Sequence, residues 1–331
     1  MSSTPTLPEI LASRSASTTP RVAHQKFDPQ LARPFIYKSL SDETRAAYHR
    51  AILEFFTFVG QVHPKDVTPS DVIAYRDHLR IQKRRKANTV ATKLAIVRSF
   101  FEYLKAGGIV PLNPASTKLV TPPELPTNPQ GRALTSKEVR YLLSGPDQRK
   151  PEGARDYAMM LVMLRLSLRL AEVSQLRRSS IKWSHGRWIL KCKIKGGREE
   201  TWPLPKDVKQ AIDDYLKLDA SRRHTLHSDG EDAFLFQPQI NYRTLEFDKP
   251  LSPRMVQKIV SRWAEFTGIG HVTPHDLRRT VVTKLLNDGH SYREVQMVTK
   301  HKDPKTIMKY DHARENLDSS PVNSLRYDDD D

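Results

Sequence analysis

Apolar residues in the first third of the chain recur at three- and four-residue steps, the spacing that places side chains on one face of a helix. After Ser41 this spacing is followed by Tyr48, Ile52, Phe55, Phe56 and Val59. A second helix is predicted from Thr68-Pro69-Ser70-Asp71, which supplies a capping hydroxyl, a proline at the first helical position and an acid at the third. A third helix carries apolar residues from Val90 to Leu104 and ends at Gly107-Gly108. These patterns predict a small all-helical domain over residues 38–117.

The second half of the chain changes from helical to strand-like patterns and back. A capping box at 135–138 begins one helix, and the apolar run from Tyr157 to Leu170 predicts a buried one. Short strand-like runs separated by glycine-containing turns predict a small antiparallel β-meander between residues 181 and 202. Helical spacing returns near Asp207 and continues in later segments. The pattern predicts a second domain, mainly α-helical with a small meander, over residues 132–315.

Three segments outside these domains lack periodic apolar residues. Residues 1–37 are rich in Ser, Thr and Pro and are expected to form a flexible tail. Residues 118–131 contain four prolines from Pro122 to Pro129, which favours an extended linker between the domains. Residues 316–331 form a C-terminal tail whose last four residues are aspartates, typical of a solvated end.

The charge balance favours a polyanionic partner. Lysine and arginine total 54 against 38 acidic residues, giving a net charge of +16 over 331 residues. Nucleic acid is therefore the leading partner. The lone Cys192 excludes an intramolecular disulfide and a thiolate cluster and suggests a reducing, cytoplasmic setting. No apolar run reaches membrane-spanning length, so no membrane partner is expected.

One cluster of basic residues lies in the predicted helical domain. Its members are Lys83, Arg84, Arg85, Lys86 and Lys93. They are expected to make sequence-independent phosphate contacts that weaken as salt rises. A solubilising loop is the alternative interpretation.

Two candidate sites combine a cation with an unusual position. Arg169 follows the long apolar helix, and Glu172 three positions later could hold its guanidinium while the free edge faces a phosphate. A structural ion pair at a helix end explains the same pattern. Lys195 lies at a glycine-rich hairpin turn, where its ammonium could protonate a leaving oxygen. An ordinary solvated lysine is the alternative there.

Two further candidates lie near the C-terminus. His275 and Arg278 share one face of a helix's first turn, where the amide dipoles also favour an anion. Tyr310 follows His301 in a short basic segment, and a phenol needs neighbouring cations to act as a nucleophile. Polar decoration of a basic helix and a packing tyrosine are the simpler explanations.

Taken together and in this order, these residues resemble the tyrosine recombinase family, or phage-type integrases, of the Xer and Cre kind. The segment 168–172, Leu-Arg-Leu-Ala-Glu, looks like the family's first-arginine motif. Lys195 matches its hairpin lysine, and 273–278 matches its histidine-x-x-arginine box. His301 and Tyr310 complete the set at the usual separation. The resemblance implies a core-binding helical domain and a catalytic domain that close around duplex DNA.

The chain departs from the family pattern at three positions. Ser167 stands where glycine is frequent, Arg279 where histidine is frequent and Lys300 where glycine is frequent. None of these changes removes a catalytic group. The two extra cations, Arg279 and Lys300, are expected to contact DNA phosphates.

The resemblance also implies a mechanism. Tyr310 would attack phosphorus and hold the strand as a 3′-phosphotyrosine, with Lys195 as the acid for the departing 5′-oxygen. The protein–DNA ester conserves the bond energy, so no ATP, cofactor or metal is expected.

The remaining catalytic groups would stabilise the charge that develops on the phosphate. Arg169 and Arg278 are the expected guanidinium clamp, because fixed donors aimed at the nonbridging oxygens stabilise the transition state. His275 and His301 would act as further donors or proton carriers, and Glu172 would orient Arg169.

The expected partners are paired recombination sites in double-stranded DNA and three further copies of the chain. Four protomers would assemble on two sites, with Val322, Leu325 and Tyr327 of the C-terminal tail contacting a neighbour. A second recombinase or an accessory protein remains an open partner, and the expected location is the nucleoid. The reaction could serve resolution, integration or inversion. Two alternatives stay open: DNA relaxation of the type IB topoisomerase kind, and a non-catalytic DNA-binding accessory role.

Overall fold

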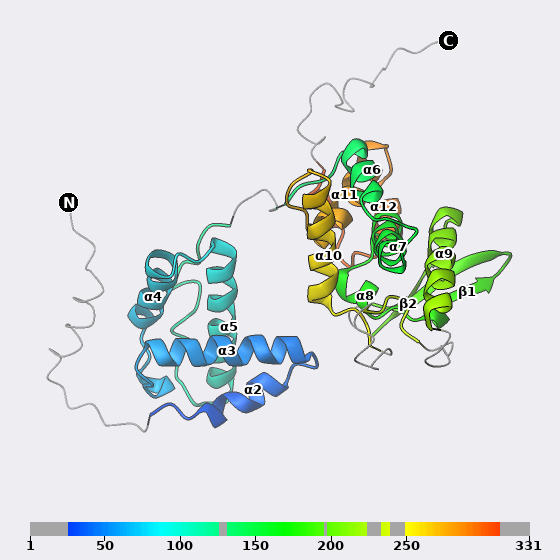
Figure 1. Cartoon of the computed structure of the whole chain (residues 1–331). Coiled ribbons are helices and arrows are strands. Elements are labelled where there is room, and N and C mark those ends of the chain that lie inside the picture. Colours follow the sequence, from blue (N-terminus) through cyan, green and yellow to red (C-terminus); the bar gives the residue numbers. More distant parts are fainter. Residues whose placement is uncertain (1–25, 126–130, 195–196, 224–232, 239–248, 312–331) are drawn as a thin grey trace, which may run out of the picture. The chain divides into compact units, whose positions relative to one another are not determined.

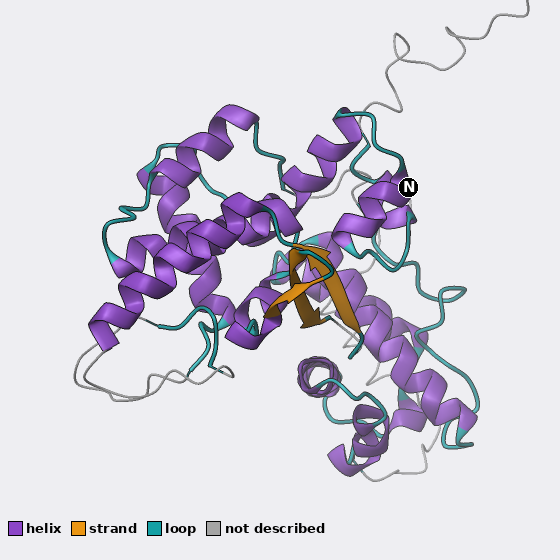
Figure 2. Cartoon of the chain, turned by 90° about the vertical axis from the view of Figure 1, so that its right-hand side faces the viewer, coloured by secondary structure: helices purple, strands orange, loops and turns teal. Residues whose placement is uncertain are grey.

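The computed structural model describes residues 26–125, 131–194, 197–223, 233–238 and 249–311, in two compact units divided between Thr127 and Asn128. Each unit is described by itself. Strands occur only in one small sheet, and the other regular elements in these ranges are helical (Figures 1 and 2). The predicted fold class, an all-helical domain and a mainly helical domain with a β-meander, is confirmed.

The first unit consists of helices and short helical turns. Its α-helices are α2 (Arg33–Tyr37), α3 (Asp42–Phe58), α4 (Pro69–Asp77) and α5 (Ala87–Ala106), with 3-10 turns at Pro29–Ala32 and Pro64–Asp66 and a π-helical turn at His78–Gln82. The predicted start of α4 is confirmed, because Asp71 N donates to Thr68 Oγ1 at 3.3 Å and Thr68 N donates to Asp71 Oδ2 at 2.9 Å.

The core of the first unit is aromatic. Phe35, Phe55 and Phe101 are fully buried, and Phe27 stacks on Phe56 with ring centroids 3.6 Å apart. The prediction of a flexible tail over residues 1–37 is therefore wrong for 26–37, because 29–37 form helical turns and Phe27, Phe35 and Ile36 are buried in the core. The sequence missed this because a few aromatic residues supply the anchoring area within a stretch rich in polar residues. Residues 1–25 lie outside the described residues.

The predicted linker, 118–131, contacts both units at its described ends. Val120 is buried in the first unit, and Arg76 donates from Nη1 to the carbonyl of Thr121 at 3.2 Å. Gly131 contacts the second unit instead. Residues 126–130 lie outside the described residues, as does the C-terminal tail with Val322, Leu325 and Tyr327.

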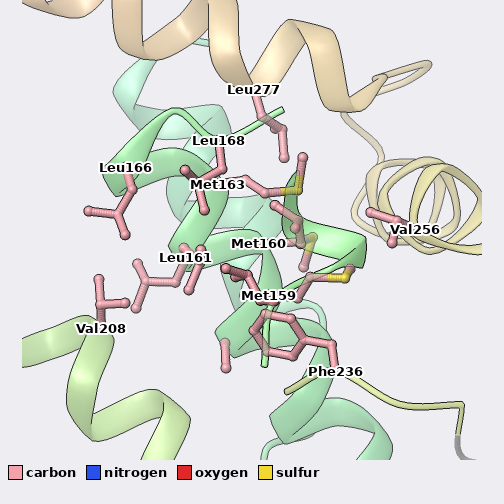
Figure 3. Close-up of a cluster of buried hydrophobic side chains, with 14 of the residues drawn as sticks. Met159, Met160, Leu161, Met163, Leu166, Leu168, Val208, Phe236, Val256 and Leu277 are labelled. Atoms are coloured by element: carbon pink, nitrogen blue, oxygen red, sulfur yellow. The ribbon is translucent and has the colours of Figure 1, made fainter. Parts of the chain in front are cut away.

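The second unit is built around one buried helix. Its helices are α6 (Ser136–Ser144), α7 (Pro151–Leu166), α8 (Leu170–Ser174), α9 (Lys206–Arg223), α10 (Pro253–Phe266), α11 (Pro274–Asn287), α12 (Tyr292–Thr299) and α13 (Lys305–Met308), with a 3-10 turn at Arg178–Ser180. The run Met159–Met163 on α7 is buried on successive positions, as expected for a helix surrounded by others (Figure 3).

Helix α7 ends earlier than the sequence predicts. The predicted buried helix ran to Leu170, but α7 stops at Leu166 because Ser167 is left-handed, with φ +55°. The chain then extends through Leu168 and starts the short α8 with Arg169 as its N-cap residue. This sharp reversal sets the direction of the Arg169 side chain.

The predicted β-meander is confirmed. Strands β1 (Ile181–Ser184), β2 (Arg187–Lys193) and β3 (Glu199–Pro203) form an antiparallel sheet in the order β1-β2-β3. The β1–β2 turn has positive φ at both His185 and Gly186, which matches the twist of a two-residue hairpin. Lys195, at the predicted β2–β3 turn, lies outside the described residues. Within the described ranges, every helix is too short or too polar to cross a bilayer.

Candidate active site

Arg169 is held by the carboxylate of Glu172. The Glu172 Oε1 atom accepts from Arg169 Nη1 at 2.9 Å, and Oε2 accepts from the Arg169 backbone N–H at 2.7 Å. The side chain of Glu172 is 5% exposed and that of Arg169 is 33% exposed. Glu172 thus fixes one edge of the Arg169 guanidinium, while another part of the guanidinium remains accessible to an anion.

Helix α11 brings His275 and Arg278 to the same region. The helix starts with a capping box in which Asp276 Oδ2 accepts from Thr273 N at 2.9 Å. Its first turn therefore has a fixed geometry, with His275 exposed and Arg278 buried. Partial desolvation, followed by the nearby guanidiniums of Arg279 and Arg278, lowers the pKa of His275, which favours the neutral imidazole.

Arg278 joins three segments that are far apart in the chain. Its Nη1 donates to the carbonyl of Ser167, and its Nη2 donates to the carbonyl of Thr299 at 2.6 Å. The same Nη2 lies 3.1 Å from Nε2 of His301. Burial, and next the charge of Arg169, lower the pKa of Arg278 to about 10, so the group is still a cation at neutral pH. Two guanidiniums thus lie close together, which makes the region attractive to an anion.

The hydrogen bonds of His301 define its tautomer. Thr299 Oγ1 donates to the carbonyl of Val295 at 2.8 Å, so it accepts from Nδ1 of His301 at 2.7 Å. A guanidinium can only donate, so Nε2 of His301 accepts from Arg278. Burial, and next the charges of Arg278 and Arg169, lower the pKa of His301 to about 3. His301 is therefore neutral with its proton on Nδ1.

Tyr310 follows α13 and is 6% exposed. Its ring packs in an apolar cluster with Val282, Val295 and Ile307, which accounts for the burial. Its hydroxyl nevertheless reaches the charged region, because the phenol oxygen lies 3.2 Å from Nε2 of His275. The structure thus brings Tyr310 to His275, and Arg278 to His301 and to the turn that carries Arg169.

Two predicted DNA-contacting cations of this unit have internal partners. Nζ of Lys300 lies 3.2 Å from Oε2 of Glu200 and 5.3 Å from the ring centroid of Trp202. Arg279 is 5% exposed, donates to the carbonyl of Gly131 and lies over the ring of Tyr310. Both cations thus have partners within this unit, and their contacts with DNA phosphates stay a prediction.

The basic residues of the first unit are placed differently. The four residues of 83–86 are all exposed, between the π-helical turn and α5. Lys93 is partly buried and forms an ion pair with Glu54. The exposed run is available to phosphates, whereas the charge of Lys93 is already balanced.

Sequence reasoning missed the groups that hold the candidate residues in place. The carbonyls of Ser167 and Thr299 fix Arg278, and the Thr299 hydroxyl fixes His301. Backbone acceptors leave no trace in residue identity, so only the structure could find them. The Thr273 to Asp276 capping box, by contrast, has a recognisable sequence pattern.

The arrangement combines two clustered guanidiniums, two neutral imidazoles and a phenol. Such a set can bind a phosphate and place a nucleophile beside a proton acceptor. Among the described residues, no group of three or more His, Cys, Asp or Glu side chains is placed to hold a metal ion.

Two family descriptions match the two units. The model of the phage integrase family matches residues 132–316, and that of the phage integrase N-terminal SAM-like domain matches residues 30–107. A tyrosine recombinase XerC of Roseiflexus sp. (strain RS-1) is 30% identical over 291 residues, which cover 87% of this chain and 88% of that protein. The similarity therefore extends over both units.

Solved structures share the fold. The Tn1549 transposon integrase in complex with circular intermediate DNA matches with a TM-score of 0.69 and 18% identity, covering 91% of this chain and 100% of that chain. A lambda integrase tetramer bound to a Holliday junction matches with a TM-score of 0.64 and 15% identity, covering 86% of this chain and 76% of that chain.

Proposed function

This chain belongs to the phage integrase family and is a tyrosine-type site-specific recombinase, and we propose that Tyr310 is the nucleophile with which it breaks and rejoins DNA. The observation that carries the assignment is the 3.2 Å contact between the Tyr310 hydroxyl and Nε2 of His275, next to the buried cation Arg278. A phenol in this position has both a proton acceptor and a positively charged region for the phosphate it attacks.

The proposed first step is an attack of the Tyr310 oxygen on the phosphorus of one DNA strand. Nε2 of His275 takes the phenolic proton, which the lowered pKa of its imidazole permits because the neutral form is populated. The new bond is a 3′-phosphotyrosine ester, and the bond to the 5′-oxygen breaks. Lys195 is the proposed donor of the proton to that leaving oxygen. Rejoining follows the same steps in reverse with a 5′-hydroxyl from the partner strand.

The proposed role of Arg169 and Arg278 is to bind the nonbridging phosphate oxygens. Glu172 fixes one edge of Arg169, and two backbone carbonyls fix Arg278, so neither guanidinium needs to reorganise as charge accumulates. His301 can donate to the phosphate only after its ring changes partners, since its Nδ1 proton is held by Thr299. We assign it to orienting Arg278.

Duplex DNA is the substrate of a site-specific recombinase, and we propose that the exposed run 83–86 adds phosphate contacts from the first unit. We further propose that four copies act together on two sites, at the nucleoid. The lambda integrase tetramer on a Holliday junction supports such an assembly by its fold similarity.

The nucleophile assignment is tested with a nicked duplex that traps the cleaved strand on the protein. The wild-type protein should form an adduct that survives denaturation, and Tyr310→Phe should form none. Tyr141→Phe is the matched control, because Tyr141 is 48% exposed on the same unit. An adduct with Tyr310→Phe would overturn the assignment. Recombinant joints from two defined sites, as opposed to relaxation of any supercoiled circle, would distinguish recombination from topoisomerase activity.

A further inference from the structure

The end of the segment between the two units is fastened to the first turns of α11. The backbone N–H of Arg132 donates to Oδ1 of Asp276 at 3.1 Å, and the carbonyl of Gly131 accepts from Nη1 of Arg279. The side chain of Arg132 also donates to the carbonyl of Ile269. Gly131 and Arg132, here called the linker anchor, thus bind the helix that carries His275 and Arg278.

The anchor depends on glycine at position 131. Gly131 has φ +107°, a conformation that residues with a side chain rarely adopt. A Cβ atom there would lie 2.4 Å from Oδ1 of Asp276 and 3.5 Å from the guanidinium carbon of Arg279. A side chain at position 131 would therefore collide with Asp276, which is one of the two residues that hold the anchor.

Arg279 joins the anchor to the nucleophile. Its guanidinium carbon lies 5.1 Å from the centroid of the Tyr310 ring, within the range of a cation–π contact. Arg279 and Tyr310 are 5% and 6% exposed, so the contact is shielded from water and stronger than one at the surface. Arg279 is also one helical turn after His275, which contacts the Tyr310 hydroxyl. Arg279 and His275, one turn apart on α11, thus contact the ring face and the hydroxyl of Tyr310.

We propose that Arg279 is a positioning residue that couples the position of the Tyr310 side chain to the linker anchor. The inference rests on the proposed role of Tyr310 as nucleophile. A guanidinium held by the Gly131 carbonyl keeps its direction over the ring, so displacing the anchor releases the ring and removes the phenol from His275. The linker anchor then controls how often the nucleophile is in place.

A first experiment measures how often the segment with Tyr310 opens in the absence of DNA. Lys309 precedes Tyr310 and is exposed, so trypsin can cut the bond between them when the segment opens. In the full-length protein, Arg279→Gln should raise the rate of cleavage at this bond, identified by mass, about tenfold. Arg149→Gln is the matched control, because Arg149 is an exposed arginine of the same unit that pairs with Asp147. Equal rates in Arg279→Gln and the wild type would overturn the inference.

A second experiment perturbs the anchor instead of the arginine. Gly131→Ala should raise the same cleavage rate, because the added Cβ displaces the carbonyl that holds Arg279. Gly268→Ala is the control, since Gly268 has φ +72° but no atom within 4 Å of an added Cβ. The double variant Gly131→Ala with Arg279→Gln should be cleaved no faster than the single variant that is cleaved faster, because both changes remove the same contact between the anchor and Arg279. If the increases in cleavage rate of the two single variants multiply in the double variant, Gly131 and Arg279 act independently and the proposal is contradicted.

A third measurement relates the position of the Tyr310 side chain to the cleavage of DNA. At saturating nicked duplex, Arg279→Gln should form the adduct about tenfold more slowly in a single turnover, with DNA affinity changed less than twofold. Arg279→Lys should recover part of the rate, because an ammonium still offers a cation to the ring. If the wild type forms no adduct, the proposed function fails while the trypsin results still decide the coupling. If it does and Arg279→Gln matches the wild type in both assays, the coupling alone fails.

Discussion

The guanidinium of Arg278 donates a hydrogen bond to the backbone carbonyl of Ser167, the residue that ends helix α7. Through this contact the first turn of α11 is attached to the reversal that presents Arg169 two residues later. Two arginines more than a hundred positions apart in the chain thus become neighbours, because one binds the backbone that aims the other. Both residues are buried, so water does not weaken this hydrogen bond.

Arg278→Lys should lower the single-turnover rate of adduct formation by at least about 100-fold, the usual cost of removing one donor to a developing anion. A lysine keeps the charge but cannot donate to Ser167, Thr299 and a phosphate in the planar arrangement of a guanidinium. The measurement is adduct formation on a nicked duplex at saturating DNA. DNA affinity should change little in comparison.

Arg262→Lys is the control for this substitution. Arg262 belongs to the same unit, is 55% exposed and pairs with Asp156 at 2.7 Å, outside the candidate active site. Its rate should stay within about threefold of the wild type, because a lysine at this half-exposed position keeps a cation opposite the buried Asp156 carboxylate. A parallel loss of DNA affinity and cleavage rate in Arg278→Lys would identify Arg278 as a binding residue only.

Ser167→Gly should stabilise the protein by about 1 kcal/mol. Ser167 has φ +55°, a left-handed conformation that costs a residue with a side chain about 1–2 kcal/mol relative to glycine. Its buried hydroxyl also has no hydrogen-bond partner among the described residues. Urea unfolding at fixed pH measures the change. Ser167→Val should be strongly destabilising, because a β-branched side chain fits this conformation poorly; equal midpoints for the two variants would contradict the explanation.

Stability should fall as the pH is lowered from about 6.5 toward 3. Burial and nearby guanidiniums lower the pKa of His301 to about 3 in the folded protein, and the pKa of His275 is lowered as well. Below pH 6.5 the unfolded chain binds protons that the folded chain does not, so each lost pH unit costs at most about 1.4 kcal/mol per histidine. Above pH 7 both states have neutral histidines, so the contribution of these two residues to the pH dependence disappears.

Urea unfolding at several pH values measures this dependence. His301→Gln should flatten the slope between pH 6 and 4, because glutamine cannot take up a proton. His185→Gln is a suitable control, since His185 is an exposed residue of the β1–β2 turn. A slope that is the same in wild type and His301→Gln would show that other groups cause the acid sensitivity.

The elements were predictable from sequence because their signals are local. The Thr68 and Thr135 capping boxes and the β1–β2 turn depend on neighbouring residues, and the structure has them where the pattern predicts. The packing of Phe27 was missed because its partner, Phe56, is remote in the chain. The candidate site was predicted as a set of residue types, whereas its assembly depends on backbone carbonyls and on the left-handed Ser167, which no residue pattern specifies.

Lys300 offers a last test, because it combines a strained backbone with a side-chain contact. Its φ is +52°, and its ammonium binds Glu200 at 3.2 Å and faces the ring of Trp202. The indole of Trp202 in turn donates to the carbonyl of Val298 at 2.7 Å, so strand β3 is attached to the end of α12, just before His301. Both contacts hold the turn that carries this histidine.

Two substitutions separate the backbone from the side chain. Lys300→Ala loses the partly buried ion pair and the ring contact and should destabilise the protein by about 1 kcal/mol in urea unfolding. Lys300→Gly loses the same contacts but relieves the left-handed backbone, so it should be about 1 kcal/mol more stable than Lys300→Ala. Exchanging the charges in Lys300→Glu with Glu200→Lys should recover part of the loss that either single change causes. If alanine and glycine at position 300 give equal stability, the left-handed conformation carries no cost there, and the lysine is retained for its contacts with Glu200 and Trp202 alone.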